Sequence, residues 1–264
     1  MHVTGPADGK SILFYHGVGG ASWSWQPQVR SLAAHRRCYV WEARGHGLAA
    51  AVGDAGLGEY YADAGEALDA AAAPGRPVFL AGHSMGGLLA LALAAERPSD
   101  VRGLILIDPV YAPEGGTHGG GALARAGRIV LAPLVRSIER DGAVARRLSR
   151  RVFAGAFLDR GSMERAWLRQ RTQVPVEYPK MMYEAFEGPT GFPNRAFATE
   201  VEMPTLLIEP AAGAPRFPRL IAELERLGDA FTHLTLDGGH YLQLDRSAAH
   251  VTSAIEEFVE RWSR

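Results

Sequence analysis

The chain has little of several things that would point to particular functions. It contains one cysteine among 264 residues, Cys38, so no disulfide can form within it. Cys38 lies in an apolar, strand-like run, where we expect a buried thiol. No apolar run reaches the roughly 18 residues that a membrane-spanning helix needs. The first residues also lack the charged and apolar regions of a signal peptide. We therefore expect a cytoplasmic protein that does not bind a membrane.

Excess charge is also lacking. The chain has 28 basic and 29 acidic residues, and only Lys10 and Lys180 are lysines. A net charge near zero without a basic motif gives no support for a nucleic-acid partner. The nine histidines show no spacing typical of a metal site. We therefore predict a small-molecule substrate, no metal and no cofactor, and the sequence leaves the oligomeric state open.

Apolar runs alternate with helical patterns along most of the chain. Short runs that are apolar on both faces predict buried strands at residues 11–16, 38–41, 77–81, 104–108, 204–209 and 232–236. Amphipathic patterns predict helices at residues 25–35, 59–73, 85–97, 217–228 and 248–262. This alternation indicates an α/β fold, with a mostly parallel central sheet and helices on both faces.

One long interval breaks the alternation. Residues 112–199 contain helical pieces and a Gly-rich opening but no strand pattern. An insertion of this length between two strands is typical of a helical lid or cap. We therefore predict a core formed by residues 1–111 and 200–264, with residues 112–199 as the lid.

The clearest chemical motif is Gly-His-Ser-Met-Gly at residues 82–86. It follows a predicted strand and opens a predicted helix. A nucleophile on such a sharp turn sits in a strained backbone, and small residues two before and two after it avoid clashes. The start of the helix also brings backbone N–H groups near the nucleophile. The motif predicts Ser84 as a nucleophile.

With this motif the chain resembles the α/β-hydrolase fold superfamily over nearly its whole length. Four further motifs match that family in order and spacing. They are His-Gly-Val-Gly-Gly at 16–20, Arg-Gly-His-Gly at 44–47, Leu-Ile-Leu-Ile-Asp-Pro at 104–109 and Gly-Gly-His at 238–240. The resemblance implies a serine hydrolase, with the backbone N–H groups of Val18 and Met85 forming the oxyanion hole. The family also begins with a β-hairpin, of which residues 2–5 look like a remnant, so we expect a truncated hairpin.

The general base should be His240, on a loop between the last predicted strand and the last helix. A neutral imidazole there can take the serine proton and return it to the leaving group. His83 lies inside the nucleophile turn and is more typical of packing. His16 and His46 belong to the loops of the first two motifs, where a supporting role is expected.

The triad acid departs from the commonest pattern of the family. In most members an Asp follows the strand matching residues 206–209, but Gly213 stands at that position here. A minority, including haloalkane dehalogenases and zearalenone lactonases, takes the acid from the place matching Asp108. We therefore predict Asp108, with Glu209 or no acid at all as the alternatives.

The substrate is less readable. Trp23 and the lid residues Met181, Tyr183 and Phe186 could line a pocket for an apolar acyl or ring group, or could simply pack. We expect hydrolysis of an apolar carboxylic ester or lactone through an acyl-enzyme. Hydrolysis of a thioester or a carbon–carbon bond by the same triad is the second reading. A non-catalytic ligand-binding protein of this fold is the third.

Overall fold

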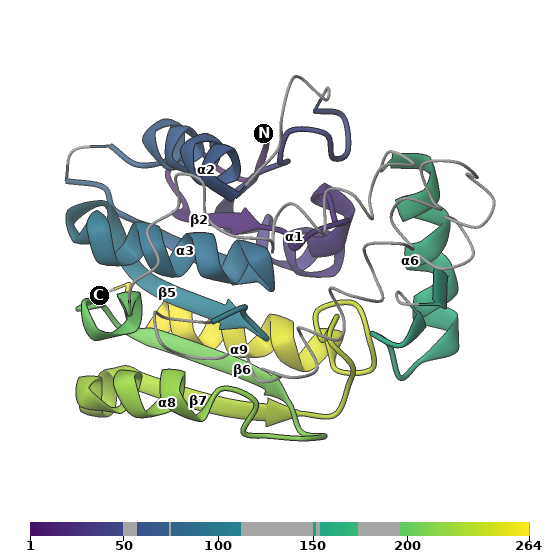
Figure 1. Ribbon diagram of the computed structural model, residues 1–264. Coiled ribbons are helices and arrows are strands. Elements are labelled where there is room, and N and C mark those ends of the chain that lie inside the picture. The colour runs from purple at the N-terminus through teal and green to yellow at the C-terminus, as the bar shows by residue number, and fades with distance from the viewer. Residues whose placement is uncertain (50–56, 74, 112–149, 152–153, 174–195, 264) are drawn as a thin grey trace.

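A computed structural model describes residues 1–49, 57–73, 75–111, 150–151, 154–173 and 196–263. In these ranges a central sheet is covered by helices on both faces (Figure 1). Most of the predicted lid, at 112–149 and 174–195, lies outside the described residues. The described part of it holds the helix α6 (Arg160–Gln173).

Seven strands form one sheet in the order β1-β3-β2-β4-β5-β6-β7. Only β1 and β3 pair antiparallel; every other neighbouring pair is parallel. All six predicted strands are present, and the remnant near the start forms a short edge strand. The strands are β1 (His2–Thr4), β2 (Lys10–Tyr15), β3 (Arg36–Val40), β4 (Val78–His83), β5 (Val101–Ile107), β6 (Thr205–Pro210) and β7 (Phe231–Leu236).

The five predicted helices are also present; four are shorter than predicted, and the second keeps its predicted length but lies two residues nearer the N-terminus. They are α1 (Gln26–Leu32), α2 (Leu57–Ala71), α3 (Met85–Glu96), α8 (Pro218–Leu224) and α9 (Ala248–Arg261). Short 3-10 turns complete the elements: η1 (Ser22–Trp25), η2 (Pro98–Asp100), η3 (Phe197–Thr199) and η4 (Glu225–Ala230). These helices supply the two outer layers that a parallel sheet needs.

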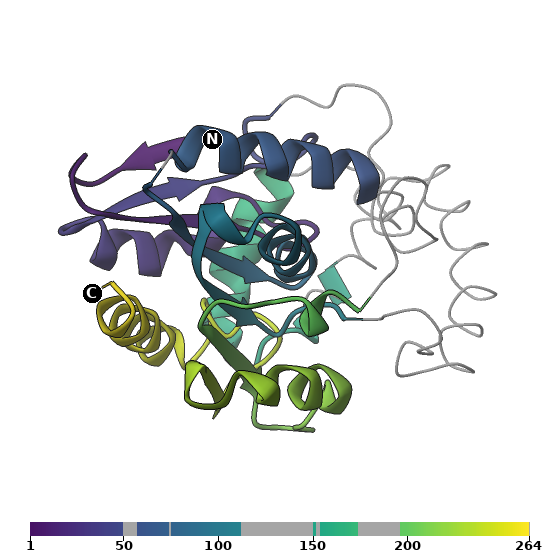
Figure 2. The same ribbon diagram turned by 90° about the vertical axis from the view of Figure 1, so that its left-hand side faces the viewer.

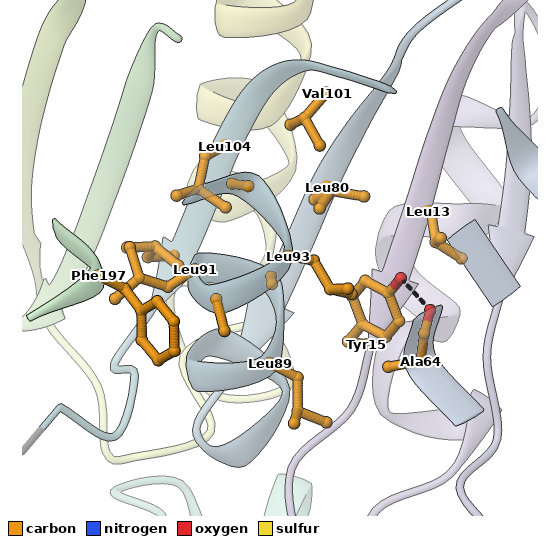
Figure 3. Packing of buried hydrophobic residues seen from close by; sticks show 14 of the residues in the cluster. Leu13, Tyr15, Ala64, Leu80, Leu89, Leu91, Leu93, Val101, Leu104 and Phe197 are labelled. Atoms are coloured by element: carbon orange, nitrogen blue, oxygen red, sulfur yellow. Dashed lines mark hydrogen bonds between the residues drawn. The ribbon is translucent and has the colours of Figure 1, made fainter. Parts of the chain in front are cut away.

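Each face of the sheet has its own core, because successive strand residues point to opposite sides. In β2, Leu13 and Tyr15 belong to the core that also contains residues of α2, α3 and α8, while Ile12 and Phe14 belong to the core that contains residues of α1 and α9. Figure 3 shows the first core, where the Tyr15 hydroxyl donates to the Ala64 carbonyl oxygen at 2.8 Å. Figure 2 shows α1 and α9 together on the other side. Burial on both faces explains why the central strands are apolar throughout.

The loops at the carboxyl ends of the strands carry the predicted site residues. The turn η3 packs into the first core, where Phe197 and Ala198 are buried. A third, smaller cluster joins α6 to the loops that follow β2 and β7. It comprises Ala21, Trp23, Phe157, Met163, Ala166 and Tyr241. Through this cluster, the described part of the insertion rests beside the predicted site.

Candidate active site

Ser84 occupies the turn between β4 and α3. Its backbone has φ 54° and ψ −118°, a conformation that non-glycine residues rarely adopt. Its N–H donates to the Ile107 carbonyl oxygen at 3.1 Å. A Cβ on Gly82 would lie 2.3 Å from the Gly86 oxygen, and one on Gly86 would lie 2.3 Å from the Tyr15 oxygen. Because no side chain fits at either position, the two glycines of the motif permit the strained turn that presents the serine.

The loop of residues 16–20 lies directly against this turn. A Cβ on Gly17 would lie 2.9 Å from the Ser84 Cβ. His16 braces the loop: its Nε2 accepts the Ala43 N–H at 3.1 Å, so its Nδ1–H donates to the Gly17 oxygen at 2.8 Å. Burial, helped by the nearby His46, lowers the pKa of His16 to about 3. A neutral ring therefore holds the loop where the predicted oxyanion donor Val18 lies.

His46 braces the same loop from the Arg-Gly-His-Gly motif. Its Nε2 accepts the Gly19 N–H at 3.0 Å, and its Nδ1–H donates to the Arg44 oxygen at 3.1 Å. Burial lowers the pKa of His46 to about 4. Arg44 is fixed in turn by two contacts with the Asp63 carboxylate, at 2.7 and 2.5 Å. The supporting roles expected for His16 and His46 therefore have a structural basis.

The structure brings His240 and Asp108 together. The His240 Nδ1 lies 2.5 Å from the Asp108 Oδ2. Asp108 directly follows β5 and is 1% exposed. Its φ of 38° falls in the left-handed region that Asp tolerates better than most residues. Its N–H donates to the Ile208 oxygen at 2.9 Å, which fixes its place at the end of the sheet.

His83 joins this pair to the nucleophile turn. Its Nε2–H donates to the His240 carbonyl oxygen at 2.9 Å, and the two rings are 4.6 Å apart. Burial, with the neighbouring His240, holds the pKa of His83 well below its ordinary value, so the ring is neutral. His83 therefore packs and orients the turn, as the sequence suggested.

Glu209, the alternative acid, has other partners. It is fully buried, and its Oε2 lies 2.7 Å from the His233 Nε2. Its Oε1 accepts the Arg216 backbone N–H at 3.1 Å. In the loop beyond it, a Cβ on Gly213 would have no neighbour within 4 Å, and Gly213 has φ +81°. No carboxylate of this loop contacts His240 among the described residues.

Arg216 is a site residue that the sequence analysis missed. Its Nη1 donates to the Asp108 Oδ2 at 2.6 Å, on the same oxygen that faces His240. Arg216 stands in the loop that holds the acid in most of the family. The sequence feature that could have revealed Arg216 is a charged residue in the very loop that lacks the carboxylate expected from the family.

Asp245 is a second residue that was missed. Its Oδ2 accepts the N–H groups of Gly239 at 2.8 Å and Leu158 at 2.7 Å, while its Oδ1 accepts that of Asp159 at 2.8 Å. Gly239 precedes His240, whereas Leu158 and Asp159 lead into α6. One carboxylate that is 4% exposed thus joins the loop of the predicted base to the insertion.

The other predicted residues fall in several places. Trp23 is buried in the cluster beneath α6, and its contact with substrate stays a prediction. Met181, Tyr183 and Phe186 lie outside the described residues. Cys38 is buried in β3 as expected, and burial raises its thiol pKa to about 12.

Neither a metal cluster nor a membrane span occurs within the described ranges. No group of three or more His, Cys, Asp or Glu side chains there is placed to hold a metal ion. No helix in those ranges is long and apolar enough to cross a membrane.

Comparison with known proteins decides the family. A model of the alpha/beta hydrolase family matches residues 12–253. The chain belongs to the alpha/beta hydrolase family. Among solved structures of this fold, an enol-lactonase from Burkholderia xenovorans LB400 superposes with a TM-score of 0.72 at 21% identity, over 98% of this chain and 95% of that one. This likeness shows the fold.

Curated members of the family match over a shorter stretch. A protein named as a carbamate hydrolase, RutD, from Variovorax paradoxus is 39% identical over 109 residues, 40% of either chain. A protein named as an esterase, PIR7A, from Oryza sativa subsp. indica is 37% identical over 114 residues, 42% of this chain and 43% of that one. The chain thus matches about two fifths of the length of these relatives.

Proposed function

We propose that this member of the alpha/beta hydrolase family is a serine hydrolase that cleaves a carboxylic ester or lactone through an acyl-enzyme on Ser84. The observation that carries the proposal is the 2.5 Å contact between His240 and the buried Asp108, beside the strained turn of Ser84. A nucleophile, a base and an acid that orients the base are what acyl transfer requires.

The proposed reaction has two halves. His240 takes the Ser84 hydroxyl proton as the oxygen attacks the carbonyl carbon, and Asp108 stabilises the resulting imidazolium. The N–H groups of Val18 and Met85 stabilise the oxyanion, by about 3 kcal/mol for each donor. The imidazolium then protonates the leaving alkoxide, and the acyl group stays on Ser84. In the second half a water molecule, deprotonated by His240, releases the acid and restores the serine.

The loops that follow β5 and β6 both support Asp108 as the acid. Asp108 reaches the His240 ring, whereas both oxygens of Glu209 are engaged by His233 and the Arg216 backbone. The position after β5 resembles that of the lactonase-like minority of the family, which favours a lactone or ester over other acyl substrates. The structural neighbour from Burkholderia, an enol-lactonase, is consistent with that choice.

The proposal extends to the insertion. Residues 112–199 would form a cap over the site, with α6 as its described anchor and with Trp23, Met181, Tyr183 and Phe186 contacting an apolar substrate. The cap rests on the loop that carries His240, because Asp245 bonds both segments. Such a cap would exclude water from the acyl-enzyme and shape the specificity of the site.

A fluorophosphonate probe tests whether the chain is an enzyme or a binding protein. We expect the wild type to be labelled and to hydrolyse p-nitrophenyl esters, and Ser84→Ala to do neither. Ser253→Ala is the matched control, since Ser253 is exposed on α9. A wild type that resists both the probe and the esters would overturn the hydrolase proposal in favour of a binding protein.

The leaving group needs a second experiment. The same three residues could cleave a thioester, a carbon–carbon bond or a carbamate, and one relative is named as a carbamate hydrolase. A panel of short esters, lactones, thioesters and carbamates with matched acyl groups should give the highest kcat/KM for an ester or a lactone. Preference for a thioester or carbamate by more than tenfold would contradict the proposed substrate class.

A further inference from the structure

The proposed acid, Asp108, contacts two side chains: Arg216, which is a cation, and His240, which becomes one when it takes a proton. Asp108 presents one oxygen, Oδ2, to the His240 Nδ1 at 2.5 Å and to the Arg216 Nη1 at 2.6 Å. Its other oxygen, Oδ1, is buried and has no hydrogen-bond partner among the described residues. Both contacts of the carboxylate therefore involve the same oxygen atom. Arg216 interacts directly with the proposed acid, although its side chain reaches the surface.

This arrangement changes the electrostatics of proton transfer. In the resting site Asp108 and Arg216 form an ion pair whose net charge is zero. When His240 takes the serine proton, the new positive charge on its ring meets the negative carboxylate and the positive guanidinium together. Arg216 therefore opposes part of the stabilisation that Asp108 provides, since like charges a few ångströms apart repel.

We propose that Arg216 is a positioning residue that holds Asp108 on His240 and, through its charge, keeps the ring unprotonated to lower pH than the acid and base alone would. The inference rests on the proposed function, because it assigns a partner to the proposed acid. It predicts that the hydrolase works under more acidic conditions than a variant that lacks this charge.

The other titratable groups that face His240 in the described structure are few. His83 contacts the ring but is neutral, because burial keeps its pKa far below the ordinary value. Tyr241 lies against it at 5.5 Å, ring to ring. Asp245 reaches only the backbone N–H of the preceding glycine. Among the described residues, Arg216 is thus a cation that can be replaced while the groups in contact with the ring, Asp108, His83 and Tyr241, keep their identity.

A neighbouring carboxylate and the solvent limit how far Arg216 can shift the pH dependence of His240. Glu209 accepts the backbone N–H of Arg216, and its other oxygen contacts His233, so a carboxylate lies beside Arg216 and offsets part of its charge. The Arg216 side chain is 41% exposed, so water screens its charge. We therefore expect a shift of about half a pH unit rather than several units.

The first test compares pH–rate profiles. Arg216→Gln should move the acid limb of kcat/KM to higher pH by about half a unit, since the imidazolium loses a repelling neighbour. Arg216→Lys keeps the charge and should keep the limb near that of the wild type. Arg219→Gln is the control, because Arg219 pairs with Glu223 on α8 instead. A profile of Arg216→Gln that overlays that of the wild type would overturn the inference.

A second test separates charge from shape. Arg216→Cys adds a thiol on an exposed loop, whereas the native Cys38 is buried. Alkylation with bromoethylamine attaches an aminoethyl cation with loss of bromide, and iodoacetamide attaches a neutral carboxamidomethyl group with loss of iodide. The cationic adduct should have its acid limb about half a unit below that of the neutral one. Equal limbs would contradict the role of the charge even if Arg216→Gln fails to fold.

A third measurement does not need turnover. In a Ser84→Ala background, adding Arg216→Gln should move the midpoint of the NMR titration of the His240 ring to higher pH. If the wild type proves inactive while this midpoint still moves, the hydrolase proposal fails and the electrostatic coupling stands. If the wild type is active and the midpoint does not move, only the inference about Arg216 fails.

Discussion

The two sides of Ser84 are held in place by different forces. On the side of the proposed oxyanion hole, the loop of residues 16–20 is fixed by His16 and His46, whose buried rings are neutral and bond backbone groups. On the side of the proposed acid and base, His240 contacts Asp108, which forms an ion pair with Arg216. One side thus depends on shape and burial, while the other depends on charge. Changes of charge and changes of volume should therefore affect the two sides differently.

The largest effect should follow from neutralising the proposed acid. Asp108→Asn keeps the shape of the side chain but removes the charge that would stabilise the imidazolium in the proposed reaction. We expect kcat to fall by about 10³- to 10⁴-fold in steady-state ester hydrolysis. Glu209→Gln is the matched control and should change kcat little, because Glu209 faces His233. If Glu209→Gln proved the more damaging of the two, the assignment of the acid would be wrong.

A change of volume should break the other side. A methyl group on Gly17 would meet the Ser84 Cβ at 2.9 Å and the His83 Nδ1 at 3.0 Å. Gly17→Ala should push the loop of residues 16–20 away from Ser84 and lower kcat/KM by about 10²-fold, without moving the acid limb of the pH profile. Gly65→Ala in α2 is the control: beyond the backbone of its own helix, the added Cβ would lie 3.9 Å from its nearest atom, the Leu93 Cδ2 of α3, and activity should be unchanged. A fully active Gly17→Ala would contradict this packing.

Substitution of Asp245 tests whether the insertion supports the loop that carries His240. Asn offers one oxygen and turns an N–H₂ group toward backbone donors, so Asp245→Asn should lose about 1–3 kcal/mol of stability in chemical denaturation. Because Gly239 is released, kcat should fall as well, by about tenfold. Asp237→Asn, in the same loop but 71% exposed, should show neither change. Equal behaviour of the two variants would mean that Asp245 does not support the loop of His240.

The smallest expected effect is on stability and concerns the neutral rings of His46 and His16. Since the pKa of His46 falls from about 6.5 to about 4 on folding, the ring gains a proton on unfolding between these values. Its contribution to the free energy of unfolding is complete above pH 6.5 and is lost as the pH falls toward 4. His46→Gln should reduce the slope of this free energy against pH by up to about 1.4 kcal/mol per unit.

The pH dependence of unfolding that is attributed to His46 is tested against a control histidine. Urea unfolding at several pH values measures the slope for each variant. His250 is exposed on α9, so His250→Gln should leave the slope of the wild type. His16, with a pKa of about 3, should contribute in the same direction as His46. A slope that His46→Gln leaves unaltered would mean that the ring is not held neutral.

Most of the sheet was predictable from local pattern, whereas His240 and Asp108 were expected as base and acid from the resemblance to the family. Continuous apolar runs marked β4, β5 and β6 because both faces of these strands are buried. The lack of a carboxylate near Gly213 favoured Asp108 as the acid. Arg216 and Asp245 were missed because their partners stand far away in sequence. Arg216 contacts a residue 108 positions away, and Asp245 contacts residues 86 and 87 positions away.

The open space beside Gly213 means that packing does not exclude a carboxylate from this loop. A Cβ there would have no neighbour within 4 Å, and Asp is among the few residues that accept its positive φ. A single substitution could therefore return an acid to this loop without displacing another group, while Arg216, paired with Asp108, favours keeping negative charge at the end of β5.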